Sequence, residues 1–486
     1  MRLSELLREV EFEGSIKNDF DIKFVTDDSR LVRPGALFVC IRHRSFDGHT
    51  AAAEALASGA AAVVTQERLG LENELNVADS RAAYARLCAA LCGHPERKLR
   101  MIGVTGTNGK TTVTTLIRNI LSDSGIKTLL TGTVCNRLGE ESLPSGLTTP
   151  KPPELYSLLS RAVLSGCEAC VAEASSQALA QGRLEGIAFD AAVFTNITRD
   201  HLDYHGTFEN YLAAKKKLFE HSEVSAVNLD DPRADEIIAA SSGKTVTFST
   251  VLDCADYTAK NISLLPEGVS FELVSKGRIE HINFASPGLF SVSNAMAAAV
   301  CAINLGVDPR SAAQSLARSK GGCGRLERVE CGTPYSVIID YAHTPDGLEQ
   351  VLRALRPSCR GKLIVLFGCG GDRDKTKRPL MGAAACKYAD TVIVTSDNPR
   401  SEEPMKIIGD ILKGTDKKRR GLFIEEDRRR ATALALSLAK PGDTVLLAGK
   451  GHEKYQLICG EKLPLDERET VREILGLPHD TGRKKP

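Results

Sequence analysis

A glycine-rich loop carrying one lysine and two threonines is the segment best suited to chemistry. It reads Gly103-Val104-Thr105-Gly106-Thr107-Asn108-Gly109-Lys110-Thr111-Thr112 and follows an apolar run. Glycines let backbone N–H groups approach phosphates, a lysine neutralises phosphate charge, and a threonine hydroxyl can bind Mg²⁺. The strict phosphate-loop pattern would place its first glycine one residue later, where this chain has Val104. The strand–loop–helix context still predicts a nucleoside triphosphate site formed by Gly106, Thr107, Asn108, Gly109, Lys110, Thr111 and Thr112.

Two further polar residues follow apolar runs of the same segment. Glu173 closes one run, and His201 lies in the turn after the next. The carboxyl ends of parallel strands meet at one edge of a sheet, which here is also the edge of the phosphate loop. We therefore expect Glu173 and His201 to hold a divalent ion. Either residue taken alone is equally consistent with a salt bridge or a capped turn.

A lysine interrupts an apolar helical stripe downstream of this turn. The stripe has the 3.6-residue period of a helix and comprises Phe208, Tyr211, Leu212, Leu218 and Phe219. Lys215 falls on this stripe, whereas Lys216 and Lys217 do not. Burial beside a metal site would lower the pKa of Lys215, and a neutral amine can react with CO₂ to give a carbamate. The alternative is a lysine whose amine reaches solvent from the edge of the core.

The elements that must position these residues divide into three α/β units. The length of 486 residues suggests about three domains. We expect a small α/β N-terminal domain (1–97), a central P-loop mononucleotide-binding parallel-sheet domain (98–326) and a C-terminal Rossmann-like domain (327–486). Apolar runs predict strands at 37–41, 61–65, 99–104, 170–174, 191–195, 336–341, 362–367, 391–396 and 444–448. Prolines at the first helical position predict helices that begin at Pro345 and Pro379.

Composition narrows the class of protein. Lys and Arg number 63 against 62 Asp and Glu, a net charge of +1 that argues against a nucleic-acid-binding arm. The longest small-apolar stretch, 51–64, is too short to span a bilayer, and no signal peptide precedes it, so we expect a cytoplasmic protein. Among 14 cysteines only Cys167 and Cys170 have CxxC spacing, and no second pair completes a zinc site. We expect free, mostly buried thiols.

Taken together, these motifs resemble the Mur ligases, ATP-dependent amide-forming enzymes that build the peptidoglycan stem peptide. The central motifs that carry the resemblance are Gly106 to Thr112, Glu173, Asp200-His201-Leu202-Asp203 and Tyr211-Leu212-Ala213-Ala214-Lys215. Further motifs are Thr26-Asp27-Asp28-Ser29-Arg30, Gly324-Arg325-Leu326-Glu327, Asp340-Tyr341-Ala342-His343 and Gly371-Asp372-Arg373-Asp374-Lys375. The chain departs from the family pattern at Arg42-His43-Arg44, where a glycine is usual, and at Ser291.

The resemblance implies a role for each matching residue. It implies Mg²⁺ as cofactor and ATP as co-substrate, with Lys110, Lys215, His201 and Glu173 as catalytic residues. It implies metal ligation by Thr111, Glu173, His201 and a carbamylated Lys215 (N6-carboxylysine). It adds Asn294, Arg325 and Asp340 to the nucleotide site. It implies contacts to a UDP-muramoyl-dipeptide from Ser29, Thr148, Thr149, Ser175, Gln181 and Arg183. The dipeptide carboxylate would attack the γ-phosphate, and an incoming amine would displace phosphate from the acyl phosphate.

The identity of the incoming amino acid is suggested by three C-terminal loops that each follow a predicted strand. On a parallel sheet these loops converge, and the residues expected to bind the amino acid are Arg373, Asp397, Asn398, Arg400, Gly449 and Glu453. The guanidinium of Arg400 can pair with the distal carboxylate of meso-diaminopimelate, with Arg373 in the same cluster. Asp397 and Glu453 can accept hydrogen bonds from the ammonium. A lysine substrate would leave Arg400 facing an ammonium, which is repulsive.

Several alternatives remain at this stage. One is a ligase that adds L-lysine, and another is an enzyme similar to folylpolyglutamate synthase. A P-loop motor or GTPase is disfavoured by the charge balance and by the combination of His201 and Lys215. We expect small-molecule substrates only, no nucleic acid, no membrane insertion and a monomeric chain.

Overall fold

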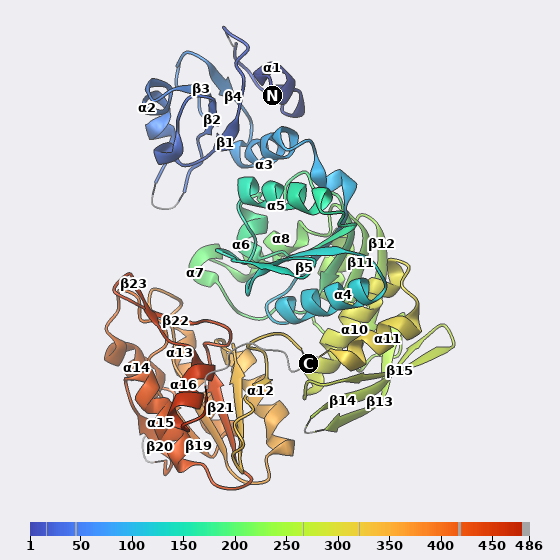
Figure 1. Ribbon diagram of the computed structural model, residues 1–486, viewed down its shortest axis with the longest axis vertical. Coiled ribbons are helices and arrows are strands. Elements are labelled where there is room, and N and C mark those ends of the chain that lie inside the picture. Colours follow the sequence, from blue (N-terminus) through green and yellow to red (C-terminus); the bar gives the residue numbers. More distant parts are fainter. Residues whose placement is uncertain (16, 44–45, 266, 320, 417–418, 479–486) are drawn as a thin grey trace.

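Three α/β units follow one another along the chain. The computed structural model describes residues 1–15, 17–43, 46–265, 267–319, 321–416 and 419–478. Arg44 of the atypical first-unit loop therefore lies outside the described residues. The N-terminal unit, drawn blue, packs against the green central unit, and the orange-red C-terminal unit lies on the other side of it (Figure 1). The central unit thus contacts both of the others.

The N-terminal unit is a four-stranded parallel sheet with strand order β1-β2-β3-β4. Its strands are β1 (Phe24–Thr26), β2 (Ala36–Val39), β3 (Ala60–Thr65) and β4 (Glu74–Asn76). Its helices are α1 (Leu3–Leu6), η1 (Leu7–Glu9), η2 (Ser29–Leu31), η3 (Gly48–Ala51), α2 (Ala52–Ala57) and α3 (Ser80–Leu91), with η4 (Pro95–Lys98) leading into the next unit. The strand expected at 37–41 begins and ends slightly earlier than its apolar run.

The central unit is built on an 11-stranded sheet with order β15-β14-β13-β12-β11-β10-β5-β9-β6-β7-β8. The strands from β13 to β6 in this order pair in parallel, as the apolar runs predict. Its strands are β5 (Arg100–Thr105), β6 (Thr128–Thr131), β7 (Asn136–Leu138), β8 (Glu141–Leu143), β9 (Ala169–Glu173), β10 (Phe189–Phe194), β11 (Ser222–Asn228), β12 (Lys244–Ser249), β13 (Tyr257–Leu265), β14 (Gly268–Ser275) and β15 (Arg278–Phe284). The antiparallel strands at both edges were not expected, because they are half exposed and carry no continuous apolar run.

The helices of this unit pack on the sheet and set the positions of the site residues. They are α4 (Lys110–Asp123), α5 (Pro152–Leu164), α6 (Ser176–Ala180), α7 (Leu202–His205), α8 (Phe208–Lys216), α9 (Ala234–Ala240), α10 (Leu289–Asn304) and α11 (Pro309–Arg318). Helix α10 is rich in alanine and is buried over most of its length. Its small side chains let it pack closely against α4, the helix that follows the phosphate loop.

The C-terminal unit is a six-stranded sheet with order β16-β17-β21-β18-β19-β20, parallel except for the edge strand β16. Its strands are β16 (Glu327–Arg328), β17 (Ser336–Asp340), β18 (Leu363–Phe367), β19 (Thr391–Val394), β20 (Leu422–Ile424) and β21 (Thr444–Ala448), beside a hairpin of β22 (Tyr455–Ile458) and β23 (Glu461–Pro464). Its helices are α12 (Pro345–Leu355), η5 (Arg356–Ser358), α13 (Lys377–Tyr388), α14 (Pro404–Leu412), α15 (Arg428–Leu438) and α16 (Glu467–Ile474). The expected start at Pro345 is confirmed.

The expected start at Pro379 is wrong by two residues, since α13 begins at Lys377. Proline is nevertheless tolerated there, because backbone N–H groups of the first helical turn have no acceptor within the helix.

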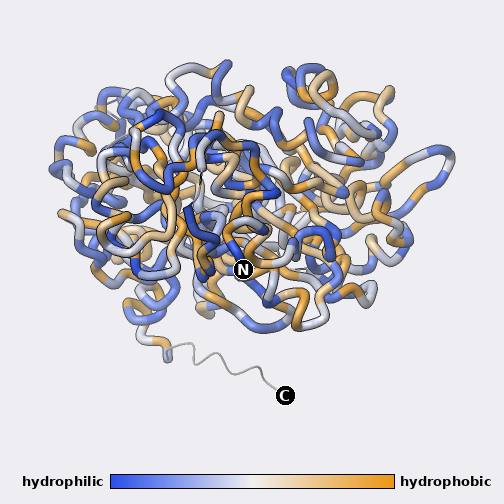
Figure 2. The backbone as a smooth tube through the Cα atoms, turned by 90° about the horizontal axis from the view of Figure 1, so that it is seen from above, coloured by the Kyte–Doolittle hydropathy of each residue, from blue (hydrophilic) through white to orange (hydrophobic). Residues whose placement is uncertain are grey.

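Hydrophobic and hydrophilic stretches alternate along the chain (Figure 2). In the part of the chain that the structure describes, no helix combines the length and the apolar character needed to cross a bilayer. The 14 cysteines all lie within the described residues and are free thiols, as expected from their scattered spacing.

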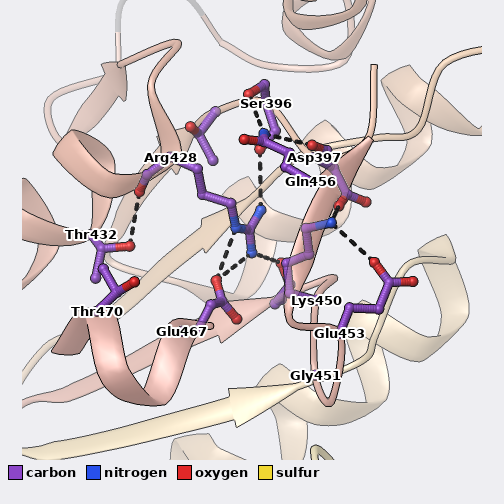
Figure 3. A network of polar contacts seen from close by, with 12 residues as sticks. Ser396, Asp397, Arg428, Thr432, Lys450, Gly451, Glu453, Gln456, Glu467 and Thr470 are labelled. Atoms are coloured by element: carbon purple, nitrogen blue, oxygen red, sulfur yellow. Dashed lines mark hydrogen bonds and ion pairs between the residues drawn. The ribbon is translucent and has the colours of Figure 1, made fainter. Parts of the chain in front are cut away.

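A buried ion pair joins the last helix to the sheet of the C-terminal unit. Arg428 at the start of α15 and Glu467 at the start of α16 are 2% and 1% exposed, and their Nη2 and Oε1 atoms lie 2.7 Å apart. Arg428 also donates to the carbonyls of Ala448 and Ser396, so its guanidinium is held on several sides (Figure 3). Replacing one partner would leave the other charge buried without compensation.

We therefore expect Glu467→Ala to lower the free energy of unfolding by about 3–5 kcal/mol, because an unpaired buried guanidinium remains. Glu473→Ala is a matched control. It removes an ion pair between the same two helices, but its partner Arg429 is 56% exposed, so a loss of about 0–1 kcal/mol is expected. Chemical denaturation measures both. Equal losses in the two variants would contradict the assignment of Glu467 as an essential buried counter-charge.

Candidate active site

The phosphate loop connects β5 to α4 and has the predicted geometry. Gly109 adopts a left-handed backbone with φ of 89°, and a Cβ there would lie 2.5 Å from the Asn294 side-chain oxygen. Glycine is therefore required at this point for two independent reasons. The Lys110 ammonium donates to the carbonyls of Gly106 and Thr107, at 2.8 and 3.0 Å, so it lies across the loop. Burial lowers the pKa of Lys110.

A cleft of about 480 Å³ opens beside this loop, between the central and C-terminal units. Most of the residues predicted to contact the nucleotide line it: Asn108, Gly109, Thr111, Thr112, Asn294, Arg325 and Asp340. Asp340 uses both carboxylate oxygens to accept the backbone N–H groups of Leu326 and Ala342, each at 2.7 Å. Its carboxylate therefore fixes the segment that joins the two units.

The atypical Ser291 lies near this cleft, in the first turn of α10. Its hydroxyl is buried and bonded to the Ser286 hydroxyl and the Pro287 carbonyl, each at 2.9 Å. The hydroxyl of this atypical serine therefore finds its hydrogen-bond partners within the chain.

Glu173 ends β9, and its carboxylate is surrounded by neutral hydrogen-bond donors. It is 1% exposed, and its carboxylate accepts hydrogen bonds from the Thr111 hydroxyl at 3.0 Å and from the backbone and hydroxyl of Thr133, each at 2.9 Å. No Lys or Arg forms an ion pair with it among the described residues. Gly132 packs against it so closely that a Cβ there would lie 2.4 Å from Oε1. A buried carboxylate without a cationic partner is suited to binding a metal ion.

His201 lies at the start of α7, after the carboxyl end of β10. Its backbone is left-handed, with φ of 52°, and its Nε2 lies 3.4 Å from Asp200 Oδ2. Burial lowers the pKa of His201 to about 4, so the ring is neutral at pH 7 and one nitrogen can bind a cation. Burial also opposes ionisation of Asp200, but interactions with His201, His343 and Lys377, together with the hydrogen bond from the His201 backbone N–H, lower its pKa to about 2.

Lys215 has the inward position that the helical stripe predicts. Its side chain is 1% exposed, and its ammonium lies 4.6 Å from the centre of the Tyr211 ring. Burial, followed by the charge of Lys110, lowers its pKa well below the usual value. The alternative of a lysine reaching solvent is therefore wrong, whereas Lys217 two residues later is exposed.

Within the described residues, no group of three or more His, Cys, Asp and Glu side chains could bind a metal ion. Glu173 and His201 would thus need additional ligands, such as an oxygen carried by a modified Lys215 or by a substrate phosphate.

The residues predicted to bind the UDP substrate form a connected group on the other side of Glu173. The Thr149 hydroxyl donates to the Glu173 carbonyl at 2.6 Å and contacts the Ser175 hydroxyl at 3.2 Å. Arg183 donates to the Thr149 carbonyl at 2.7 Å and to the Gln181 side chain at 2.7 Å. Thr148 is connected to this group because its hydroxyl accepts a hydrogen bond from the Thr133 hydroxyl at 3.1 Å.

Ser29 lies apart from this group, in η2 of the N-terminal unit. That unit is tied to the central one by an ion pair between Asp27 and Lys151 at 3.0 Å. Lys151 was not predicted, because a single exposed lysine before a proline carries no distinguishing pattern.

A second cleft, of about 140 Å³, lies where the three C-terminal loops converge as expected. All the residues predicted to bind the amino acid line it, namely Arg373, Asp397, Asn398, Arg400, Gly449 and Glu453. His201 and Asp203 of the central unit complete its wall, and Arg373 lies 3.9 Å from the Asp203 carboxylate. The cleft is therefore shared between the two units.

Backbone hydrogen bonds hold Arg400 in place at the edge of this cleft. Its φ of 55° is left-handed, and its N–H and C=O both bond to the β22–β23 hairpin. Its Nη1 donates to the Gly371 carbonyl at 2.8 Å, which leaves the rest of the guanidinium available to the cleft.

Sequence reasoning missed Lys450 as a functional residue. Lys450 is fully buried beneath the cleft, and its ammonium contacts Asn398 Oδ1 at 2.5 Å. It also contacts Glu453 Oε2 at 3.0 Å and Asp397 Oδ1 at 3.4 Å (Figure 3). Burial alone would raise the pKa of Asp397, but the charges of Lys450 and Arg428 lower it. The Lys450 ammonium thus favours the ionised form of Asp397 and donates a hydrogen bond to Glu453. A lysine between two glycines gives no signal of this role.

Comparison with known proteins agrees with this geometry. Family models match as "Mur ligase family, catalytic domain" over residues 21–89, "Mur ligase middle domain" over 104–302 and "Mur ligase, glutamate ligase domain" over 324–451. The UDP-N-acetylmuramoyl-L-alanyl-D-glutamate–2,6-diaminopimelate ligase of Syntrophomonas wolfei is 42% identical over 98% of this chain and 99% of that protein.

Solved structures show the same architecture. A UDP-N-acetylmuramoyl-L-alanyl-D-glutamate–2,6-diaminopimelate ligase is 34% identical with a TM-score of 0.71, covering 98% of this chain and 99% of that one. The MurF ligase from Thermotoga maritima, solved with ADP, shares the fold at 19% identity and a TM-score of 0.61, covering 94% of this chain and 97% of that one. From its matched domains and its full-length relatives, the chain belongs to the Mur ligase family.

Proposed function

We propose that the protein is the ATP-dependent ligase that adds meso-2,6-diaminopimelate to UDP-N-acetylmuramoyl-L-alanyl-D-glutamate in peptidoglycan precursor synthesis. The observation that carries this proposal is the second cleft. Arg373 and Arg400 face the carboxylates of Asp397 and Glu453 across one space there. Asp200, His201 and Asp203 of the central unit line the same space. Full-length relatives that bear this name support the same substrate.

The two clefts suggest how the substrates meet. Tyr341 and His343 line both, so a nucleotide in the larger cleft and an amino acid in the smaller one would lie side by side. The dipeptide carboxylate would be presented from the Thr149, Ser175 and Arg183 side of Glu173. It would attack the γ-phosphate to give an acyl phosphate and ADP, and the amine would then displace phosphate to form the amide.

The chain's own cations would reduce the repulsion between the carboxylate and the triphosphate. Two anions at contact distance repel strongly in a water-poor site. Lys110 lies where the phosphates would bind, and Arg325 reaches the Thr111 hydroxyl at 3.4 Å. Both would hold the transferred phosphoryl group, while the backbone N–H groups of the loop orient it.

Mg²⁺ fits the residues present. Glu173, His201 and a carbamate on Lys215 would hold one ion, and Thr111 would hold a second. The fit rests on the buried Glu173 carboxylate, which forms no ion pair among the described residues, and on the lowered pKa of His201. When bound, Mg²⁺ would neutralise charge on the phosphates and on the attacking carboxylate.

The predicted units divide the work in this proposal. The N-terminal unit (1–97), which includes Ser29, would bind the UDP moiety. The central unit (98–326) would bind the nucleotide, and the C-terminal unit (327–486) would bind the amino acid. We further propose that the enzyme acts in the cytoplasm as a monomer on small-molecule substrates, without nucleic acid.

Lys215→Ala is expected to abolish turnover, because the buried amine that forms the carbamate is removed. Added bicarbonate or a short-chain carboxylate should partly restore activity by supplying the missing oxygen ligand. Phosphate release measured with all three substrates tests this. Lys217→Ala, two residues away and exposed, is the control and should retain full activity. A fully active Lys215→Ala enzyme would rule out the carbamate.

Diaminopimelate is expected to be used in strong preference to L-lysine, because the lysine side chain places an ammonium opposite Arg400. Arg400→Ala should raise the KM for diaminopimelate by about 10- to 100-fold, the loss expected for a charge-assisted hydrogen bond, with little change in the KM for ATP. Arg353→Ala, at an arginine of the same unit that is 61% exposed, is the control. Equal use of lysine by the wild-type enzyme would refute the substrate assignment.

A further inference from the structure

Tyr341 is placed where it can act on both clefts at once. It follows β17 directly and lines the larger nucleotide cleft as well as the smaller amino-acid cleft. Its hydroxyl contacts a residue of one cleft, and its ring contacts a residue of the other.

On the amino-acid side, the Tyr341 hydroxyl donates to Glu453 Oε1 at 3.2 Å. The other oxygen, Oε2, is held by Asn398 Nδ2 at 2.9 Å and by the Lys450 ammonium at 3.0 Å. Burial and the charge of Glu453 raise the pKa of the Tyr341 phenol, so the hydroxyl keeps its proton and remains a donor. Tyr341 therefore fixes the one carboxylate oxygen that Lys450 and Asn398 leave unbound.

On the nucleotide side, the Arg325 guanidinium lies over the Tyr341 ring, 4.7 Å from its centre. The same guanidinium donates to Thr111 Oγ1 at 3.4 Å, and its Nε has no hydrogen-bond partner in the described part of the chain. The aromatic face is thus a principal support of an arginine that reaches into the phosphate site.

The ring between these two contacts has little freedom to move independently. The His343 and His452 rings lie 4.8 and 5.1 Å from it, centre to centre. Gly451 packs so closely that a Cβ there would lie 2.7 Å from the Tyr341 Cβ. A displacement at the hydroxyl is therefore transmitted to the face that supports Arg325.

We propose that Tyr341 is a positioning residue that couples amino-acid binding at Glu453 to nucleotide binding at Arg325. The inference rests on the proposed function, because it takes Glu453 as a group that receives the ammonium of the amino acid. When nucleotide phosphates hold Arg325, the ring is fixed, and the hydroxyl presents Glu453 to the amino acid in its binding orientation. Thermodynamic linkage requires the reverse effect to be equally large.

The test measures the Kd of diaminopimelate by calorimetry, with and without a non-hydrolysable ATP analogue, in the presence of the UDP-dipeptide and Mg²⁺. The wild-type enzyme should bind diaminopimelate about 5- to 150-fold more tightly with the analogue, the usual range for coupled sites. Tyr341→Phe keeps the ring and loses the hydroxyl. It should bring this ratio close to one while changing the Kd of the analogue alone by less than about twofold, because the cation–π contact remains.

Two further variants separate coupling from general damage. Tyr341→Leu removes the ring as well, so it should also weaken binding of the analogue alone. Tyr388→Phe removes a similar hydrogen bond in the same unit, from Tyr388 to Glu349 at 2.6 Å, and neither of these residues lines a cleft. It should keep the wild-type ratio.

The outcomes distinguish the two proposals. A wild-type ratio of one, or a wild-type ratio retained in Tyr341→Phe, would overturn the coupling role alone. A wild-type enzyme that ligates lysine and binds no diaminopimelate would overturn the proposed function, and the inference with it.

Discussion

The arrangement of both clefts depends on how the segment that leads into β16 is anchored, and the Glu327 carboxylate at the start of that strand is its main anchor beside Asp340. Glu327 accepts the Gly324 N–H at 2.6 Å and pairs with Arg468 of α16 through Oε1 at 2.5 Å and through Oε2. Gly324 in turn packs so closely on the loop after β21 that a Cβ would lie 2.3 Å from the His452 N atom. This contact brings the carboxyl edges of two parallel sheets together, and each sheet supplies one wall of the site.

Several ionisable side chains of the central and C-terminal units are buried. Glu173, Lys215, Lys450, Arg428 and Glu467 are each at most 2% exposed. Three of them, Lys450, Arg428 and Glu467, are compensated within the chain, whereas Glu173 and Lys215 form no ion pair among the described residues. Glu173 is buried without an ion pair among the described residues, and Lys215 is buried with a lowered pKa, so both residues point to chemistry rather than to stability. The three compensated residues, Lys450, Arg428 and Glu467, keep the smaller cleft in shape before any ligand enters.

The features predictable from sequence were those that rest on local pattern. Buried parallel strands are continuous apolar runs, so β5, β9, β10 and β21 were located to within a residue or two. The inward position of Lys215 followed from helical periodicity alone, because three and four residues separate neighbours on one helix face. The convergence of Arg373, Arg400 and Glu453 followed from the rule that loops after parallel strands share one edge.

The features that sequence could not give depend on which strands become neighbours. Tyr341 meets Glu453 across 112 residues because β17 lies beside β21, an order that no local pattern encodes. Lys450 became part of the site for the same reason. The antiparallel strands β13 to β15 were missed because half-exposed hairpins alternate in polarity and resemble loops when the register is unknown.

The position of α16 has a consequence for synthesis of the enzyme on the ribosome. Its first two residues, Glu467 and Arg468, supply the counter-charges for Arg428 and for Glu327, which lie about 40 and 140 positions earlier. Until translation has passed this helix, Arg428 lacks its ion-pair partner Glu467, and the junction between the units is held by fewer contacts. A nascent chain therefore has a complete nucleotide loop long before it has a working site, and prematurely terminated chains would carry that loop without a properly shaped amino-acid cleft.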